Sequence, residues 1–187
     1  VLLGLLLAPA TPSAAYKAAP MPLPFLLGPA LVGLAVPVWA GRARLRRLAV
    51  PIALALVAGA VTAIVSSVGI LALFGAPREM LASIAPRATT TPVAMAIAGQ
   101  IGGVPALAAV LVMIGGVGGV MIATPLLNLM GLRDYRARGF AVGIATHGIG
   151  AARAFQVDAT AGAMASLAMA LNAAATAILL SVLALIV

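Results

Sequence analysis

Three consecutive threonines and a proline, Thr89-Thr90-Thr91-Pro92, form the first group of residues that could bind a ligand. They interrupt an apolar segment, and Pro92 can start a new helix because its fixed φ angle suits the first turn. The free backbone N–H groups of such a helix start, together with the hydroxyls, suit a carboxylate or another anion. The alternative is that the threonines only cap the helix. The sequence leaves both interpretations open.

The stretch Thr146–Gly150, with Arg153 three residues beyond it, is the second such group. Its glycines let the backbone unwind and approach a ligand closely. A guanidinium inside an apolar segment is costly, so Arg153 should face water, a partner or a carboxylate, whose two oxygens its donors fit. The alternatives are an Arg153 that extends to the membrane interface and a His147 that hydrogen-bonds a neighbouring helix. The predicted binding residues of the two groups are Thr89, Thr90, Thr91, Pro92, Thr146, His147, Gly148, Gly150 and Arg153.

The rest of the chain holds few residues with catalytic or metal-binding chemistry. With no cysteine, one histidine and three acids, neither a disulfide nor a metal cage is expected. There is no Ser/His/Asp set, no pair of carboxylates and no nucleotide motif. Gly115–Gly119 lies inside a long apolar run and predicts close helix packing, while Gln100, Asn128 and Asn172 predict contacts between helices. We therefore expect neither an enzyme nor a cofactor.

The composition places these groups in a membrane protein. Hydrophobic residues make up 64% of the 187 positions and charged residues 7%, whereas soluble domains are about half apolar and about a quarter charged. So few charges cannot cover a surface that faces water. The net charge of +8 does not indicate nucleic-acid binding, because the basic residues gather in short gaps between apolar runs. The predicted partner of this surface is a lipid bilayer.

Three uncharged segments exceed the roughly 20 residues that a helix needs to cross a bilayer. They are Leu48–Phe74, Val104–Met130 and Thr160–Val187. Leu23–Ala40 is a shorter, proline-kinked candidate, and residues 9–22 are predicted to form a loop. The apolar Val1–Ala8 is interpreted as the remnant of a truncated helix, with the end of a signal peptide as the alternative.

Two further apolar segments, Met80–Gly103 and Gly139–Val157, are interrupted by the two candidate groups. Each is long enough for two half-helices around an unwound centre. Interrupted segments at matching positions in two halves point to the binding site of a transporter. The spacing from Thr90 to Thr146 is 56 residues, and the long spans that start at Leu48 and Val104 are also 56 residues apart. This recurrence predicts two repeats.

Basic residues between the spans predict the orientation of the chain. The cluster Arg42–Arg47 should be cytoplasmic. If Met80–Gly103 enters the membrane and returns on the same side, the basic stretch Gly131–Arg138 is cytoplasmic too, whereas a full crossing would put it outside. The re-entrant arrangement therefore fits the charges and gives the halves opposite orientations. The predicted fold is an all-α, polytopic transmembrane bundle over residues 1–187, a single domain of two repeats, each with a long span and a broken helix.

Long motifs in a fixed order run through the chain from about Phe25, with no large gap. They are Phe25–Ala30 with Ala35–Pro37, Pro86–Ala94 with Gln100–Gly103, Gly131–Asp134, Arg138 with Gly139, Gly143, Thr146–Ala154 and Gly162–Met169. Together they resemble the LrgB/CidB family. Family members usually have an additional N-terminal helix before the region that matches Phe25.

The resemblance implies a multi-pass protein of the bacterial inner membrane that modulates murein hydrolase activity and autolysis with a holin-like LrgA/CidA partner. Related plastid proteins carry glycolate and glycerate, and bacterial pairs are tied to pyruvate uptake. The leading hypothesis is therefore a carrier of small monocarboxylates, which bind between the two breaks with Arg153 as the counter-charge. The alternative is a non-transporting regulatory subunit of the holin-like partner. A third option, a channel, would show flux without saturation, and a homo-oligomer is left open.

Overall fold

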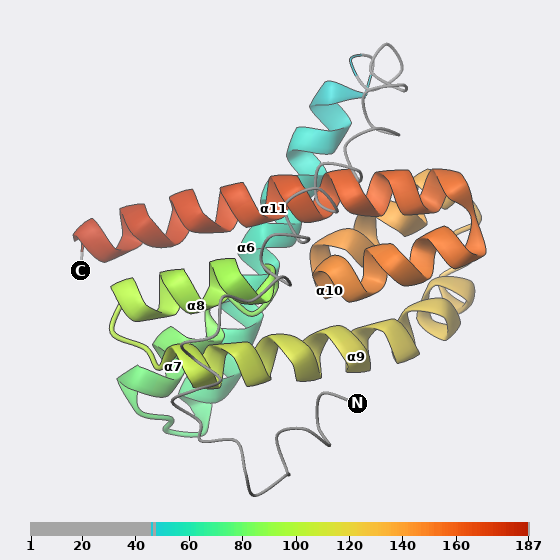
Figure 1. Ribbon diagram of the computed structural model, residues 1–187. Helices are drawn as coiled ribbons and strands as arrows, with labels where there is room; N and C mark the ends of the chain where they lie inside the picture. The colour runs from blue at the N-terminus through green and yellow to red at the C-terminus, as the bar shows by residue number, and fades with distance from the viewer. Residues whose placement is uncertain (1–45, 47, 187) are drawn as a thin grey trace, which may run out of the picture. The chain divides into compact units, whose positions relative to one another are not determined.

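The computed structural model describes residue 46 and residues 48–186, and all of the regular structure in this part of the chain is α-helical (Figure 1). The helices are α6 (Ala49–Leu73), α7 (Arg78–Ile84), α8 (Thr91–Gln100), α9 (Pro105–Leu129), α10 (Tyr135–Val157) and α11 (Ala159–Ile186). The predicted all-α class is confirmed. The predictions for Val1–Ala8, for residues 9–22 and for Leu23–Ala40 lie outside the described residues.

Helices α6, α9 and α11 are the three predicted spans, and their bounds fall within one residue of the prediction. Each contains a 25-residue stretch that is long and apolar enough to cross a bilayer. Large apolar side chains on their outer faces are exposed, among them Leu54 (68%), Val65 (62%) and Met121 (74%). A surface of this kind needs lipid as its solvent. The protein is therefore a membrane protein, as its composition predicts.

The chain between α6 and α9 turns back on itself. Residues 85–90, which are not part of an α-helix, separate α7 from α8. After α8, the N–H of Val104 donates a hydrogen bond to the Ser83 hydroxyl at the end of α7 (2.8 Å). Gly103 lies so close to α7 that a Cβ there would meet the Ser83 nitrogen at 2.8 Å. The end of this segment therefore lies against the last turn of α7.

Helix α10 is broken at His147, whose backbone angles (φ 44°, ψ −135°) are not helical. In the first half, residues 135–146, a Cβ on Gly139 would meet the Cα of Ala161 at 2.7 Å, and a Cβ on Gly143 would meet the Cα of Ala165 at the same distance. Both contacts join residues 22 positions apart, so this half runs parallel to α11. Only glycine permits this approach of two backbones.

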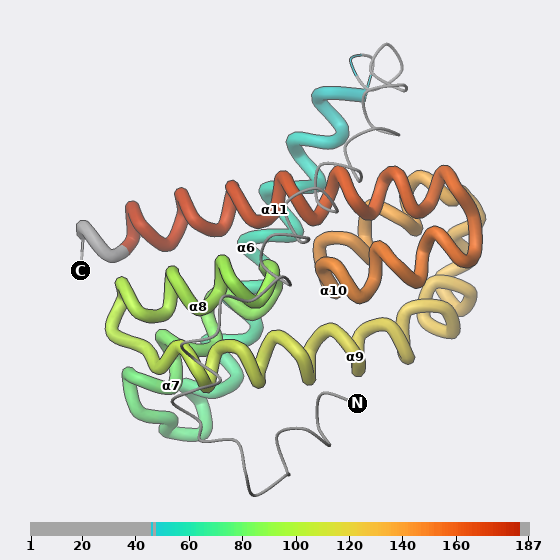
Figure 2. The backbone as a smooth tube through the Cα atoms, in the orientation of Figure 1, coloured from blue at the N-terminus to red at the C-terminus, as the bar shows by residue number. Residues whose placement is uncertain are grey.

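The second half of α10, residues 148–157, packs on the same part of α11. Ala151 and Ala154 form one buried cluster with Ala161 and Ala165. The chain passes through Asp158 directly into α11, so this half runs antiparallel to it (Figure 2). Both halves of α10 therefore lie against the first turns of α11, and the segment begins and ends at the same end of that helix.

Acidic side chains cap the N-termini of the last two helices, α10 and α11. The Asp134 carboxylate accepts bonds from the guanidinium of Arg136 (2.6 Å) and from its backbone N–H (2.8 Å), which lower the pKa of Asp134 to about 2. This ion pair is exposed to solvent, where such pairs contribute little to stability. Asp158 accepts the N–H groups of Thr160 and Ala161 and so caps α11.

The contact between α10 and α11 predicts a large difference between two glycine substitutions. Gly143→Ala should lower the free energy of unfolding by about 1–3 kcal/mol, because the new methyl group overlaps the backbone of Ala165. Gly69→Ala in α6 is the control, since a Cβ there meets nothing within 4 Å; it should be neutral or stabilise by up to about 1 kcal/mol. Thermal unfolding of the purified variants in detergent measures both. Equal stability of the two variants would contradict the parallel packing.

Candidate functional site

Asn172 of α11 is fully buried and joins the two non-helical stretches. Its Nδ2 donates to the carbonyl of Ala88, in residues 85–90 (2.9 Å), and to the carbonyl of Ile144, just before the break in α10 (3.4 Å). One side chain therefore donates to a backbone carbonyl beside each interruption.

At the first interruption, residues 85–90, one of the three threonine hydroxyls is already hydrogen-bonded within the turn. The Thr89 side chain is buried, and its hydroxyl donates to the carbonyl of Pro86 (2.8 Å). Thr90 is the residue immediately before α8, in the N-cap position, but its hydroxyl makes no capping hydrogen bond. Thr91 and Pro92 form the first turn of α8, with Thr91 half-buried. The capping alternative therefore does not account for the hydroxyl of Thr90.

The second interruption packs against α9. Nε2 of the buried His147 lies 3.0 Å from the Val112 carbonyl of α9. Because a carbonyl can only accept, Nε2 carries the proton in this hydrogen bond. A Cβ on Gly116 would lie 2.7 Å from the His147 ring, and one on Gly119 would overlap the methyl group of Thr146. The glycine run of α9 thus packs closely, as predicted, and it does so against the break in α10.

The two glycines of this interruption have different roles. A Cβ on Gly150 would overlap the Thr146 hydroxyl and lie 2.7 Å from a methyl group of Val142, eight residues back in the chain. Gly150 is therefore needed for a reversal this tight. A Cβ on Gly148 would make an ordinary contact with the Met169 sulfur at 3.7 Å, so no neighbouring atom requires glycine there.

A cleft of about 590 Å³ lies between α6, residues 85–90 and the first half of α10. This volume falls within the range of about 300–1,000 Å³ that is typical of small-molecule sites. Arg87 is the one charged residue among the described residues that line it, and Thr62 and Ser66 add hydroxyls from α6. The remaining lining residues are Ala55, Ala58, Gly59, Ala63, Ala88, Ala137, Phe140, Ala141, Ile144 and Ala145.

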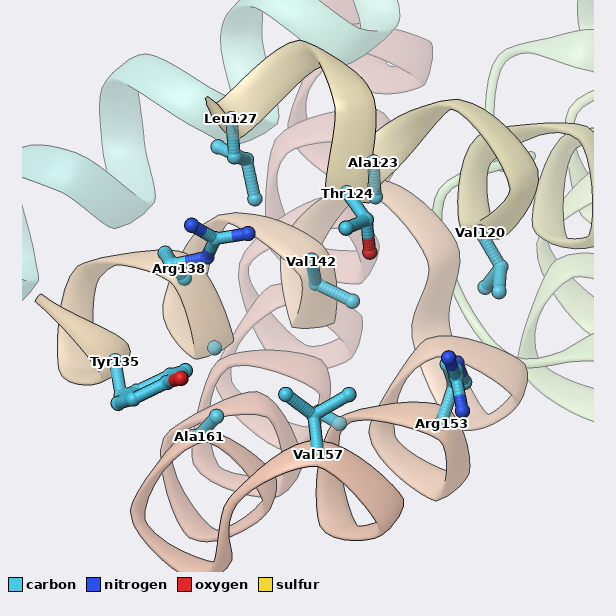
Figure 3. Close-up of a pocket in the computed structure, with 12 residues that line it drawn as sticks. Val120, Ala123, Thr124, Leu127, Tyr135, Arg138, Val142, Arg153, Val157 and Ala161 are labelled. Atoms are coloured by element: carbon cyan, nitrogen blue, oxygen red, sulfur yellow. The ribbon is translucent and has the colours of Figure 1, made fainter. Parts of the chain in front are cut away.

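A second, smaller pocket of about 50 Å³ lies where the two ends of α10 meet α9 (Figure 3). Arg138 and Arg153 line it from opposite halves of α10, together with Tyr135 and Thr124. The Arg153 side chain is exposed and donates to the Gln156 side chain (3.1 Å). At this volume the pocket has space for a few waters but not for an organic acid.

The structure therefore brings only part of the predicted site together. Asn172 holds the first interruption next to the second, but neither pocket contains both Arg153 and the stretch 89–92. The counter-charge role of Arg153 stays a prediction. Arg87 is the residue that sequence reasoning missed, although it stands between Pro86 and the threonines, where the argument applied to Arg153 holds equally. Within the described ranges, no three His, Asp or Glu side chains gather to hold a metal ion.

These features define a polytopic helical membrane protein with two chain reversals joined by a buried asparagine. Residues 1–186 match the profile of the LrgB-like family, and the chain belongs to that family. The resemblance inferred from its motifs is thereby confirmed. No solved structure matches the chain.

Relatives in three bacteria support this assignment. The chain is 36% identical over 148 residues to the uncharacterized protein YxaC of Bacillus subtilis, covering 79% of this chain and 64% of the relative. It is 27% identical over 161 residues to the holin-like protein CidB of Staphylococcus epidermidis, covering 86% and 70%. It is also 27% identical over 156 residues to the antiholin-like protein LrgB of Bacillus mycoides, covering 83% and 68%. The chain thus spans about two thirds of the length of these relatives.

The central position of Asn172 can be tested by substitution with leucine, which has a similar size. Asn172→Leu should lower the free energy of unfolding by about 1–3 kcal/mol, because it leaves the buried carbonyls of Ala88 and Ile144 without their donor. Asn128→Leu is the matched control on the exposed side of α9 and should change stability by about 0.5 kcal/mol or less. Thermal unfolding in detergent distinguishes the two. A stable Asn172→Leu protein would show that the interruptions do not depend on this bond.

Proposed function

We propose that this protein is a multi-pass protein of the bacterial inner membrane that carries small monocarboxylates of the glycolate, glycerate or pyruvate type. We further propose that this transport is linked to the control of murein hydrolase activity and autolysis. The observation that supports the carrier function is the 590 Å³ cleft with one arginine in an otherwise uncharged wall.

Arg87 suits a carboxylate by its chemistry and its surroundings. The guanidinium presents a planar fork of donors that can bind both oxygens of a carboxylate. Its side chain is half-buried, and Nη1 lies next to Gly115, where a Cβ would be 3.4 Å away. The small side chains of the cleft leave space beside it, and the hydroxyls of Thr62 and Ser66 can bond the hydroxyl or carbonyl oxygen of a short acid.

The binding residues that the sequence predicts are also part of the proposed carrier. The stretch Thr89-Thr90-Thr91-Pro92 begins two residues after Arg87 and forms the start of α8, whose first N–H groups favour an anion. Thr146, His147, Gly148 and Gly150 form the tight reversal beside the cleft wall of α10. Arg153 faces the small pocket with Arg138, where two positive charges would draw anions towards the protein.

The path of the chain supports two re-entrant segments. The chain after α8 returns to the last turn of α7 at Ser83, and the ends of α10 line one pocket. Helices α6 and α9 are both 25 residues long and begin 56 positions apart, at Ala49 and Pro105. We propose that α6 to α8 and α9 to α10 are inverted repeats, and that one moves against the other to open the cleft to either side of the membrane.

The names of the relatives support a membrane partner. CidB is named holin-like and LrgB antiholin-like, which fits association with a holin-like LrgA/CidA protein and not an enzyme activity. The second candidate function follows from these names: a non-transporting subunit that regulates such a partner. A homo-oligomer is compatible with either function.

Uptake of labelled pyruvate or glycolate by proteoliposomes that contain the purified protein alone tests the carrier. Arg87→Gln should reduce uptake at low substrate concentration by at least about tenfold, because a hydrogen bond to a charged group contributes about 1.5–3 kcal/mol. Arg78→Gln is the matched control, since Arg78 is exposed at the start of α7 and lines neither pocket. It should transport like the wild type.

The other outcomes separate the alternatives. If Arg153→Gln abolishes uptake and Arg87→Gln does not, the counter-charge is Arg153 and the cleft is not the binding site. If the wild type and both variants are equally silent, the carrier function fails and the regulatory subunit is favoured. Uptake that does not saturate with substrate concentration would identify a channel.

A further inference from the structure

Two buried polar atoms lie one helical turn apart on α11 with no hydrogen-bond partner among residues 48–186. They are Oδ1 of Asn172 and the hydroxyl oxygen of Thr176. Asn172 is 0% exposed and Thr176 is 1% exposed. A buried oxygen without a partner is costly, and in native proteins such atoms are few. Two of them on the same side of one helix therefore indicate a bound group that supplies their contacts.

The orientation of the Asn172 amide is set by its neighbours. Its Nδ2 faces two backbone carbonyls, those of Ala88 and Ile144. A flipped amide would place oxygen against oxygen at both positions, so these two bonds identify the atom without a partner as the oxygen Oδ1. Because Oδ1 can only accept, the group that it contacts must be a hydrogen-bond donor or a cation.

Thr176 faces the same non-helical stretch as Asn172. Leu180, one turn further along α11, packs against Ala85, at the start of residues 85–90. Asn172, one turn before Thr176, bonds Ala88 in the same stretch. Residues four apart share a face of a helix, so Thr176 lies between these two contacts, on the face of α11 that packs against residues 85–88.

We infer that Oδ1 of Asn172 and the hydroxyl oxygen of Thr176 are ligands of a sodium ion that is bound where α11 packs against residues 85–88. All of the available ligands are neutral oxygens. A divalent ion such as Ca²⁺ or Mg²⁺ prefers carboxylates, and no Asp or Glu is buried in the described part of the chain. Amide and hydroxyl oxygens do not take up a proton at neutral pH, so a proton does not fit either. Carbonyls of unwound backbone at helix ends are suited to sodium.

The site also shares a residue with the anion cleft. Ala88 lines that cleft, and its carbonyl accepts the bond from Asn172. Arg87, the charged residue of the cleft, is the preceding residue. An ion bound by Oδ1 of Asn172 would therefore fix the amide that holds the backbone next to Arg87. Its role as the coupling ion rests on the proposed carrier function, whereas its binding does not.

Sodium binding can be measured on the purified protein in detergent without any transport. With choline chloride as the reference salt, sodium chloride should raise Tm by about 5 °C or more at a concentration about 100-fold above its Kd. Potassium chloride at the same ionic strength should not. Thr176→Val keeps the shape of the side chain but removes the oxygen, and it should weaken the response to sodium at least tenfold. Binding of ²²Na⁺ to the wild type gives an independent measurement.

Two further variants keep the test decisive. Thr176→Ser retains the hydroxyl and should keep the sodium response, which covers the case in which Thr176→Val fails to fold. Ser67→Ala removes a buried hydroxyl that already donates to Ala63 within α6 (2.6 Å), and it should respond like the wild type. If the wild type binds no ²²Na⁺, or if Thr176→Val responds to sodium as the wild type does, water occupies this position and the inference is wrong. Because no substrate is present, this failure is distinct from failure of the carrier function.

Discussion

The hydrogen bonds of Asn172 are the constraint on which the arrangement of the other elements depends. Both interruptions expose backbone carbonyls, and the core of a bilayer offers no water to satisfy them. A buried backbone carbonyl is stable only where a donor takes the place of water. Asn172 does so for Ala88 and Ile144, which are 84 and 28 residues away in the sequence. It thereby determines how the first interruption, α10 and α11 lie relative to one another.

Close packing of small residues allows α10 to approach α9 and α11 as closely as this arrangement requires. Lipid is as apolar as the helix surfaces, so helices in a membrane associate through close contact and hydrogen bonds and not through the hydrophobic effect. Gly139 and Gly143 bring the first half of α10 onto the backbone of α11, and Gly116 admits the ring of His147 to the surface of α9. The strained backbone of His147 persists because these contacts hold it on both sides.

The sequence predicts the spans well and the site only in part, for a physical reason. The bounds of α6, α9 and α11 follow from the thickness of the bilayer and the length of each uncharged run, which are local properties. Proline and glycine likewise mark where the backbone is interrupted. Which arginine faces a cavity is not local, because the reversal at His147 carries Arg153 back towards Tyr135 and away from the threonines. Only the fold shows that Arg87 lines the larger cleft.

The charges of the proposed sites are consistent with one another. The cleft offers a single arginine, which suits a monoanion, and the site on α11 offers only neutral oxygens, which suit a monovalent cation. Moving one charge through the membrane potential costs or releases about 2.3 kcal/mol per 100 mV. A carboxylate that enters a cell with a negative interior moves against this potential. One sodium ion that moves with it cancels the charge, so the pair crosses without electrical work while the sodium gradient still drives uptake. Two separate sites that share the backbone of Ala88 are a geometry in which such a pair can be bound together.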